Sequence, residues 1–423
     1  MQTVTIIGLG YVGLPLACLC ARKGYNVYGI DLNSEIVNKT NEGISHIDDD
    51  DLKKDVSLLK GKIKATNSYE ECIPKSNIVI VCVPTPVKEN YLPDLKYVES
   101  ASQSIFPHLK KDQLIVLEST VHPGTCEEIV IPQLNKNGLK LGEDFYFAYC
   151  PERIDPGNTT WTIEKIPRVI GGYNNKSAQI AKRFYDTVLE GETTAVSSLK
   201  AAEATKIVEN TFRDINIAFV NELAMSFDNM DIDIKEVIKG ASTKPFAFMP
   251  HYPSCGVGGH CIPVDPYYLI EKAKNVGFEH KFLSLARNIN NGMPNFTIEK
   301  LKELMGNESL ENKNIGILGL SYKANIDDMR ESPSLKIIEI LKNDKANPIV
   351  YDPHVLEKSD VETFEELLQK VDYLILCTNH KEFVDMDYNL LKENNIKIII
   401  DGKNCLDKEK LKQINIKYKG IGR

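Results

Sequence analysis

The feature that most restricts the fold is a group of closely spaced glycines at the start of the chain. Gly8, Gly10 and Gly13 follow a β-branched segment at 4–7 and precede a helical pattern. Glycines at this spacing allow a tight strand-to-helix turn, and the helix start offers unpaired N–H groups to a pyrophosphate. The pattern predicts a dinucleotide-binding unit. The residues expected to contact the dinucleotide are Gly8, Gly10, Tyr11, Val12 and Gly13.

An acidic residue follows the second expected strand. Asp31 comes directly after the segment 27–30, about the spacing at which a carboxylate meets an adenosine ribose. A carboxylate there also repels a 2′-phosphate, so the sequence favours NAD over NADP. Glycines alone are equally compatible with a tight turn in another α/β protein, but their position, the strand before them and Asp31 together argue for the dinucleotide site.

Short β-branched runs alternate with helical patterns up to about residue 195, which implies a parallel, doubly wound sheet. The expected strands are 4–7, 27–30, 78–83, 114–117, 145–148 and 169–170. Such sheets bind ligands at the carboxyl ends of their strands. Pro84 and Thr85 follow one strand and Ser119 and Thr120 follow the next, so these four residues are also predicted to lie at the cofactor. Either loop taken alone is also compatible with an ordinary connection.

Beyond the first sheet the pattern changes twice. From 199 to about 230 the turn signals vanish and a helical period persists, and 231–300 looks helical around an irregular loop at 250–266. After a polar junction at 301–311, strand-like segments recur at 315–318, 349–351, 373–376 and 398–400. We therefore predict an α/β protein with two Rossmann-like, doubly wound parallel-sheet domains, 1–198 and 306–423, joined by a long central helix and further helices in 199–305.

Charge and composition argue against some classes of binding partner and cellular location. The formal net charge of −8 arises from 59 acidic and 51 basic residues spread along the chain, which argues against a nucleic-acid or anionic-membrane surface. The chain starts without a basic leader or cleavable apolar core and has no apolar run of membrane-spanning length, so we expect a cytoplasmic protein. Ten scattered cysteines, with no Cys-x-x-Cys pair, are expected to be reduced and mostly buried.

A glycine-rich loop at 255–266 presents a cysteine. Because most buried thiols are inert, any one of ten cysteines would ordinarily be a packing residue. Cys261 differs because it follows Gly258 and Gly259, where backbone N–H groups can stabilise a thiolate, so we predict a nucleophile. Asp265 can orient water or a proton donor. A metal site at Cys255, His260 and Cys261 is the alternative, but no second ligand pair appears, so no metal is expected.

Two further pairs of polar residues can assist a reaction at Cys261. Lys206 and Asn210 are four residues apart on the long helix and therefore share a face, from which they can stabilise an oxyanion. The alternative interpretation is that Lys206 is a solvated lysine and Asn210 an amide on the helix surface. Glu152 and Arg153 follow the strand that ends near Tyr149; by themselves they are equally compatible with a surface ion pair.

Taken together, these motifs resemble those of the UDP-glucose/UDP-mannuronate dehydrogenase family along essentially the whole chain. The matching segments are 8–13, 83–86, 118–120, 123–125, 151–153, Lys206 with Asn210, 256–261, 322–323 and 327–332. The resemblance implies oxidation of a UDP-sugar at C6 by two NAD in succession, with a thiohemiacetal and then a thioester on Cys261. It also implies a site shared by the two terminal domains, and a homodimer formed through the central helices.

The resemblance assigns roles to individual residues. Cys261 is the nucleophile, Lys206 and Asn210 stabilise the oxyanion, and Asp265, Glu152 and Thr120 support proton transfer or position water. Arg330 contacts the cofactor from the C-terminal domain. The residues implied to bind substrate are Glu152, Arg153, Lys206, Asn210, Tyr252, Gly258, Arg287 and Lys323.

Two segments, 151–158 and 166–172, indicate which UDP-sugar the family resemblance implies. The sequence from Pro151 to Asn158 and the segment 166–172 resemble the branch acting on UDP-N-acetylhexosamines, with UDP-N-acetylglucosamine favoured and UDP-N-acetylmannosamine second. UDP-N-acetylgalactosamine and UDP-glucose follow. Tyr252-Pro253-Ser254-Cys255 departs from the commoner lead into the loop, so Cys255 is either a packing residue or a second thiol near the site.

Two rival functions are also compatible with the sequence. A single-step NAD-linked dehydrogenase would share the N-terminal domain and long helix without needing Cys261. A non-catalytic NAD-binding regulator would keep the fold and lose the chemistry. Against the regulator, Cys261, Lys206, Asn210 and Asp265 are all present.

Overall fold

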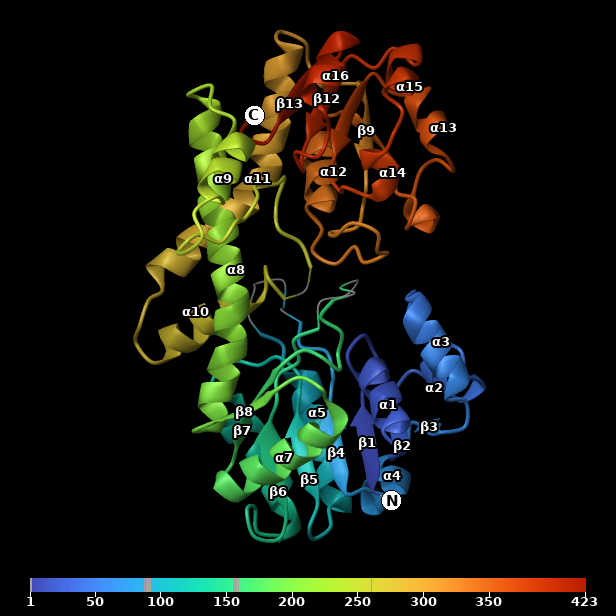
Figure 1. The fold of residues 1–423 in the computed structure, drawn as a ribbon, viewed down its shortest axis with the longest axis vertical. Coiled ribbons are helices and arrows are strands. Elements are labelled where there is room, and N and C mark those ends of the chain that lie inside the picture. Colours follow the sequence, from blue (N-terminus) through green and yellow to red (C-terminus); the bar gives the residue numbers. More distant parts are fainter. Residues whose placement is uncertain (1, 87, 89–92, 155–157, 159, 260) are drawn as a thin grey trace. The chain divides into compact units, whose positions relative to one another are not determined.

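The computed structural model describes residues 2–86, 88, 93–154, 158, 160–259 and 261–423 (Figure 1). The chain divides into two compact units. The first contains Met1–Glu209 and Tyr267–Phe278, and the second contains Asn210–Pro266 and Glu279–Arg423. The three-domain boundaries at 198 and 305 stay a prediction. His260 and residues 155–157, which belong to motifs discussed above, lie outside the described residues.

The first unit is built on an eight-stranded sheet in the order β3-β2-β1-β4-β5-β6-β7-β8. Its strands are β1 (Thr3–Ile7), β2 (Asn26–Ile30), β3 (Ile63–Thr66), β4 (Ile78–Val81), β5 (Leu114–Leu117), β6 (Tyr146–Tyr149), β7 (Arg168–Gly172) and β8 (Thr193–Val196). The α/β fold class and all six expected strands are confirmed. The strands that the sequence did not indicate, β3 and β8, are the two edges, where part-exposed side chains interrupt the apolar run.

Strand direction differs from the prediction at one place. β7 pairs antiparallel with β6, and β8 then runs parallel to β7, so the expected all-parallel sheet is wrong for these two strands. A parallel pair needs a crossover connection, usually a helix, and none is assigned in the described part of 150–167. The reversal brings Arg168, the first residue of β7, to the edge at which β5 and β6 end.

Helices cover both faces of this sheet (Figure 1). They are α1 (Gly13–Arg22), α2 (Ser34–Glu42), α3 (Asp50–Leu58), α4 (Tyr69–Cys72), α5 (Lys96–Ile105), α6 (Ile131–Leu134) and α7 (Asn175–Val188), with the first part of α8 (Leu199–Asp228). Most of α10 (Asp265–Asn275) also belongs to this unit. Helices α1 and α7 pack on one face, and α5 and α6 on the other. The central strands are buried on both sides, which is why they read as unbroken apolar runs.

The second unit carries a smaller sheet in the order β10-β9-β11-β12-β13, parallel throughout. Its strands are β9 (Asn314–Leu318), β10 (Asn347–Tyr351), β11 (Tyr373–Leu376), β12 (Ile398–Asp401) and β13 (Lys417–Gly420). The predicted four are confirmed, and the polar edge strand β13 is additional. Its helices are α9 (Ile234–Ala241), α11 (Lys281–Met305), α12 (Pro333–Asn343), α13 (Phe364–Leu368), α14 (Lys381–Val384), α15 (Tyr388–Glu393) and α16 (Lys408–Gln413).

The predicted long helix is confirmed as α8, 30 residues from Leu199 to Asp228. Its C-terminal part packs with α9 and α11 around a small apolar core that includes Ile421. Asp228 accepts ion pairs from Lys300 at 2.8 Å and from Lys419 at 2.6 Å. These contacts fasten the end of the chain to α8 and α11 within the second unit.

The two sheets begin with the same turn. The N–H of Gly8 donates to Ile30 O at 2.7 Å, and that of Gly319 donates to Tyr351 O at 2.9 Å. In each case the residue after the glycine donates to an aspartate at the end of the neighbouring strand: Leu9 N to Asp31 Oδ2 (2.9 Å), and Leu320 N to Asp352 Oδ2 (2.6 Å). Both units are therefore built from the same strand–turn–helix–strand arrangement.

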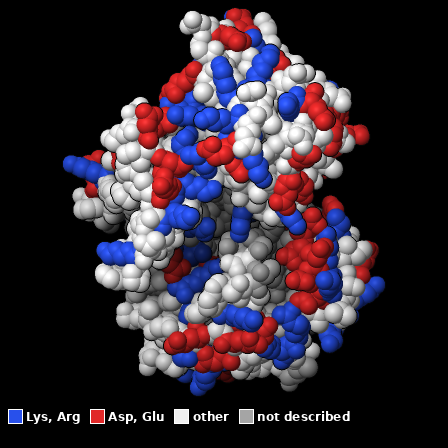
Figure 2. Space-filling view, turned by 45° about the horizontal axis from the view of Figure 1, so that its top comes forward, with Lys and Arg blue, Asp and Glu red and all other residues white. Residues whose placement is uncertain are grey.

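Acidic and basic side chains are intermixed over the face shown in Figure 2, as the scattered charge along the sequence predicts. Within the described part of the chain, no helix combines the length and apolarity required to cross a membrane. Likewise, no three histidine, cysteine or acidic side chains of these residues are grouped so that they could hold a metal ion.

Candidate active site

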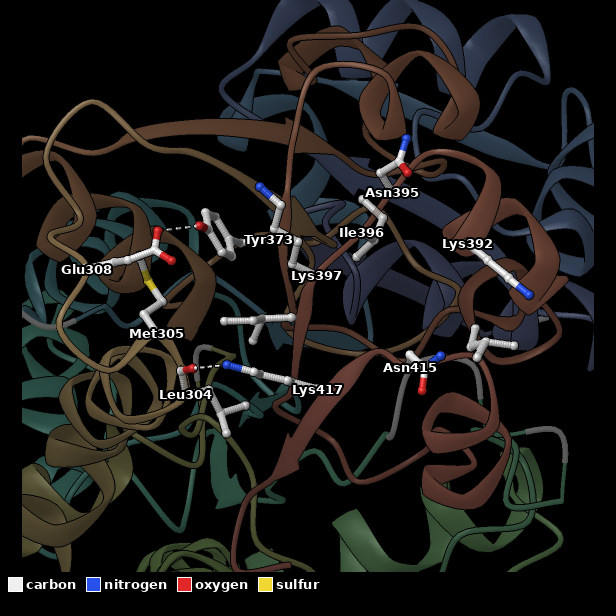
Figure 3. A pocket seen from close by; sticks show the side chains of 12 residues that line it. Leu304, Met305, Glu308, Tyr373, Lys392, Asn395, Ile396, Lys397, Asn415 and Lys417 are labelled. Carbon is white, nitrogen blue, oxygen red and sulfur yellow. Dashed lines mark hydrogen bonds between the residues drawn. The ribbon is translucent and has the colours of Figure 1, made fainter.

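A cavity of the second unit lies away from the residues expected to carry the chemistry. It has a volume of about 490 Å³ and is lined by Tyr373, Ile398 and Lys417, at or next to the starts of β11, β12 and β13 (Figure 3). In parallel sheets ligands bind at the opposite, carboxyl ends of the strands. The candidate site is therefore expected among the residues at those carboxyl ends.

Two positions of the glycine turn in the first unit, Gly8 and Gly13, exclude a larger residue. Gly8 has φ +89°, and a Cβ on Gly13 would lie 1.8 Å from Gly8 O. A Cβ at Gly10 would meet nothing within 4 Å, so the turn is open at that point. Val12 precedes α1, and the side chain of Tyr11 is exposed. An open, glycine-rich turn at a helix start fits a dinucleotide pyrophosphate.

Asp31 is held where the sequence predicts it. Its Oδ2 accepts from Leu9 N and its Oδ1 accepts from Asn33 N, both at 2.9 Å. The carboxylate is only partly buried, and each oxygen has a second lone pair for a ribose hydroxyl. Asp31 thus ties the glycine turn to β2 while remaining able to bind a ligand.

Two predicted cofactor loops meet beside this turn. Ser119 Oγ donates to Val83 O at 2.7 Å, which joins the end of β5 to the loop after β4. Tyr268 of α10 donates its hydroxyl to Thr85 O at 2.8 Å. Pro84, Thr85 and Ser119 are therefore brought together, and Thr120 follows directly as a half-buried residue.

A buried ionic cluster that the sequence did not reveal supports the next loop. Arg168 Nη1 donates to Pro151 O at 3.1 Å and lies 3.5 Å from Glu118 Oε2, while Tyr185 donates its hydroxyl to Glu118 Oε1 at 2.5 Å. Burial raises the pKa of Glu118, against the opposing charge of Arg168. Only the reversed strand β7 brings Arg168 here, so sequence spacing carried no signal for it.

Glu152 follows Pro151 and has a carboxylate oxygen that lacks a hydrogen-bond partner among the described residues. This oxygen, Oε1, is buried. Burial raises the pKa of Glu152, and the positive charge of Lys206 lowers it. Glu152 and Lys206 are thus near one another. Arg153 instead donates Nε to Glu209 at 3.1 Å and Nη1 to Pro167 O at 2.9 Å, so its role toward substrate stays a prediction.

The cysteine loop belongs to the second unit. Val264 N and Asp265 N donate to Cys261 O at 3.1 and 2.8 Å, which places Cys261 immediately before the first turn of α10. The positive end of a helix stabilises a thiolate. Asn210 of α8 donates Nδ2 to Asp265 Oδ2 at 2.5 Å. Three predicted catalytic residues, Asn210, Cys261 and Asp265, are therefore linked through two hydrogen bonds.

Cys255 is a packing residue. It is fully buried, its N–H donates to Gly402 O at 2.9 Å, and its thiol donates to Cys377 O at 3.6 Å. This resolves the alternative left by the sequence, because Cys255 is anchored to the ends of β11 and β12. Tyr252 is exposed, three residues ahead.

Arg287 is buried rather than presented on a surface. Its side chain is 4% exposed, and its Nη1 lies 2.6 Å from Asp214 Oδ1. Asn290 also donates to Asp214 Oδ1, at 2.8 Å, and burial raises the pKa of Asp214. Asn221 then links Asn290 to the N–H of Ser254, ahead of the cysteine loop. Binding of substrate by Arg287 stays a prediction, whereas its support of this loop is evident.

Lys323 and Arg330 lie on the segment between β9 and α12. Arg330 donates Nε to Asp328 Oδ1 at 2.9 Å, and its carbonyl accepts from Gly259 N at 2.9 Å. A Cβ on Gly258 would lie 2.5 Å from Tyr322 Cβ, so this segment packs directly on the glycine loop. The predicted substrate residues Gly258 and Lys323 are thus on adjoining segments.

Comparison with known proteins decides the family. Residues 2–189 match the NAD binding domain of the UDP-glucose/GDP-mannose dehydrogenase family, residues 200–292 its central domain and residues 316–408 its UDP binding domain. The chain belongs to the UDP-glucose/GDP-mannose dehydrogenase family. It is an NAD-dependent UDP-sugar dehydrogenase, and the resemblance predicted from its motifs is confirmed.

Individual relatives cover nearly the whole dehydrogenase. A UDP-N-acetyl-D-mannosamine dehydrogenase of Pyrococcus horikoshii is 36% identical over 99% of both chains. A UDP-N-acetyl-D-glucosamine 6-dehydrogenase of Pseudomonas aeruginosa is also 36% identical, over 96% of this chain and 98% of its own. A solved structure of UDP-D-ManNAc dehydrogenase from Pyrococcus horikoshii superposes with a TM-score of 0.93 at 35% identity, covering 100% of this chain and 99% of the other.

Proposed function

We propose that this dehydrogenase oxidises a UDP-N-acetylhexosamine at C6 to the uronate, through a covalent intermediate on Cys261. UDP-N-acetylglucosamine is the first candidate from the motif at 151–158, and UDP-N-acetylmannosamine is the second. Relatives of the same identity bear both names, so the N-acetylhexosamine class is better supported than either sugar. The observation that carries the proposal is the placement of Cys261 before α10, with Asp265 bound by Asn210.

The chemistry follows from these groups. Bound NAD accepts a hydride in each oxidation. In the first, the C6 alcohol loses a proton and a hydride to become an aldehyde, to whose carbon the Cys261 thiolate adds, giving a thiohemiacetal. In the second, the thiohemiacetal loses a proton and a hydride to become a thioester. Water then adds to the thioester carbonyl, releasing the carboxylate and the thiol.

The remaining groups manage charge and protons. Lys206 and Asn210 stabilise the oxygen anion that forms at C6. Glu152, with a carboxyl group largely withdrawn from solvent, takes the proton of the attacking water, and Thr120 positions that water. Asp265, fixed by Asn210, supports proton transfer at Cys261. Lys323 and Arg330 contact the substrate phosphates and the cofactor, respectively.

The direct test is the number of NADH formed per sugar. Each of UDP-N-acetylglucosamine, UDP-N-acetylmannosamine, UDP-N-acetylgalactosamine and UDP-glucose is supplied at a limiting amount with excess NAD. About two NADH per sugar from one N-acetylhexosamine supports the proposal and identifies the substrate. About one NADH per sugar would favour a single-step dehydrogenase, and NADH from UDP-glucose alone would contradict the N-acetylhexosamine assignment.

Cofactor preference provides a prediction at Asp31. In Asp31→Asn the 2′-phosphate of NADP no longer meets a negative charge, so the ratio of kcat/KM for NAD to that for NADP should fall by about tenfold or more. The amide oxygen can still accept from Leu9 N, which preserves the turn. Asp50→Asn, an exposed aspartate on α3, is the control. An unchanged ratio would show that Asp31 does not face the ribose.

The pH dependence should report Glu152. As a base, Glu152 must be ionised, and since burial raises its pKa above the usual 4.5, kcat/KM for the sugar should fall as the pH drops toward that raised value. Activity is therefore gained as the pH rises through the pKa of Glu152. In Glu152→Gln this acidic limb should disappear and the remaining rate should be low. The same limb in the variant would assign it to another group.

We also propose a homodimer formed through the helices of the second unit. Phe212 and Phe219, seven residues apart on one face of α8, are 49% and 55% exposed, and Phe282 on α11 is 65% exposed. Side chains of this size are usually covered. Light scattering should give a molar mass of twice the 47.5 kDa chain mass for the wild type. The Phe219→Glu variant should have the mass of a single chain. Leu58→Glu, which changes an apolar residue of α3 that is 80% exposed, should remain dimeric. A monomeric wild type would refute the dimer.

A further inference from the structure

The segment between β9 and α12 supports the backbone that precedes the nucleophile. Tyr322 packs against Gly258 and Gly259, whose added Cβ atoms would lie 2.5 and 2.9 Å from the tyrosine side chain. Arg330 O accepts the N–H of Gly259 at 2.9 Å. Because Gly259 is two residues from Cys261, the position of this segment determines where the cysteine loop runs.

The other side of the same segment is fastened to the end of β11. Asn325 donates its N–H to Nδ1 of His380 at 2.9 Å, and its side-chain oxygen accepts from Lys381 N at 3.0 Å. Asn325 has φ +60°, a conformation that asparagine tolerates better than most residues. Thr378 adds a bond from its hydroxyl to Ser321 O at 2.5 Å. The segment is thus hydrogen-bonded to Thr378, His380 and Lys381, which follow β11, and we call this set of bonds the clasp.

His380 is the central member of this clasp. It is fully buried, and its Nε2 lies 3.1 Å from Asp352 Oδ2. Since the N–H of Asn325 is a donor, Nδ1 must be unprotonated and Nε2 must carry the proton given to Asp352. Burial would raise the pKa of Asp352, but the bonds from His380 and Ser321 N hold it below its usual value. One imidazole therefore joins the start of the segment to its middle.

We propose that His380 is a positioning residue for the oxidation. Its Nδ1 holds Asn325, and through the 322–330 segment it sets both the backbone ahead of Cys261 and the position of Lys323. The catalytic part of this inference rests on the proposed function. The structural part, that the Nδ1 bond orders the segment, stands independently. The sequence marked Lys323 and Arg330 but contained no signal for His380, which lies 50 residues beyond Arg330.

Two substitutions separate the two bonds of the imidazole. In His380→Asn the amide oxygen can occupy the place of Nδ1 and accept from Asn325, whereas the bond to Asp352 is lost. In His380→Gln the amide nitrogen can reach the place of Nε2 and donate to Asp352, whereas the bond to Asn325 is lost. Both variants lose the ring. His354→Gln is the control, since its ring stacks on His380 at 4.6 Å and lies outside the clasp.

The first measurement is amide hydrogen exchange on the protein without ligand, in peptides covering 254–259 and 321–332. The inference predicts that His380→Gln exchanges faster in both peptides, whereas His380→Asn and His354→Gln stay close to wild type. Faster exchange in His380→Asn than in His380→Gln would overturn it, because the bond to Asp352 would then be the important one. Equal protection in all variants would also overturn it. This measurement does not depend on activity.

The second measurement is NADH formation with the UDP-sugar that the wild type oxidises. Positioning predicts that kcat/KM falls by about tenfold or more in His380→Gln and by much less in His380→Asn, with NAD affinity unchanged in both. A fall that follows the unfolding temperature equally in both variants would reduce His380 to a purely structural residue. If wild type forms no NADH from any UDP-sugar while the exchange result holds, the proposed function fails and the structural part survives.

Discussion

Replacing Cys261 by serine is expected to stop uronate formation, with a fall in its rate of at least about 10³-fold. A serine hydroxyl at this position is far less ionised than a thiol, so it cannot capture the aldehyde or leave from an ester as readily. Any NADH that the variant forms should not exceed about one per sugar. The measurement is the product mixture and NADH count with the sugar that wild type oxidises.

The matched control is Cys405→Ser, because Cys405 is a free thiol of the same intermediate exposure. It lies between β12 and α16 and should retain wild-type turnover. A Cys261→Ser enzyme that still produces uronate at the wild-type rate would exclude the covalent path and favour the single-step dehydrogenase. A covalent adduct seen by mass spectrometry in wild type and absent in the variant would support the thioester directly.

Removing the carboxylate of Asp214 should produce the largest loss of stability. Asp214 and Arg287 are 1% and 3% exposed, and their ion pair is 2.6 Å long. In Asp214→Ala the guanidinium is left buried without its carboxylate, which costs about 3–5 kcal/mol. For a unit of this size, the midpoint of thermal unfolding by circular dichroism should drop on the order of 10 °C. Asn290 loses one of its two acceptors on Asp214 and keeps the backbone carbonyl, so the link toward Ser254 should loosen only in part.

The double variant Asp214→Ala/Arg287→Met distinguishes the buried charge from lost packing. Removing both charges should recover roughly half or more of the lost stability, since the apolar part of the side chain remains. A double variant no more stable than Asp214→Ala would show that the packing of the carboxylate itself, rather than an unpaired Arg287, is responsible. Asp360→Ala is the control, because Asp360 is an exposed aspartate in the loop after β10 and its loss should cost less stability.

The fold was largely predictable because its central strands are buried on both faces. Segments such as Ile78–Val81 and Leu114–Leu117 are continuous apolar runs, and the long period of α8 is plain in the sequence. The edge strands β3, β8 and β13 are part-exposed and mixed in composition, so periodicity did not reveal them. The direction of β7 could not be read because it depends on the connection from β6, in whose described residues no helix is assigned, rather than on a local sequence pattern.

The site residues likewise fall into those that the sequence predicted and those that it did not. Residues in local motifs, such as Gly8, Asp31, Cys261 and Asp265, were predicted because the turn or helix that positions them is encoded by their neighbours. Arg168 and His380 were missed because their partners lie far away in sequence. Sequence spacing cannot report that Arg168 meets Glu118, or that His380 meets Asn325.

The repeated turn has a consequence for protein engineering. Asp31 and Asp352 occupy matching strand ends, yet Asp31 is partly exposed, whereas Asp352 is fully buried and Oδ2 accepts from Leu320 N, Ser321 N and His380. Cofactor preference can therefore be redesigned at Asp31 with little danger to folding. The equivalent change at Asp352 would remove the acceptor on which an entire loop depends, so libraries should vary the first position and leave the second unchanged.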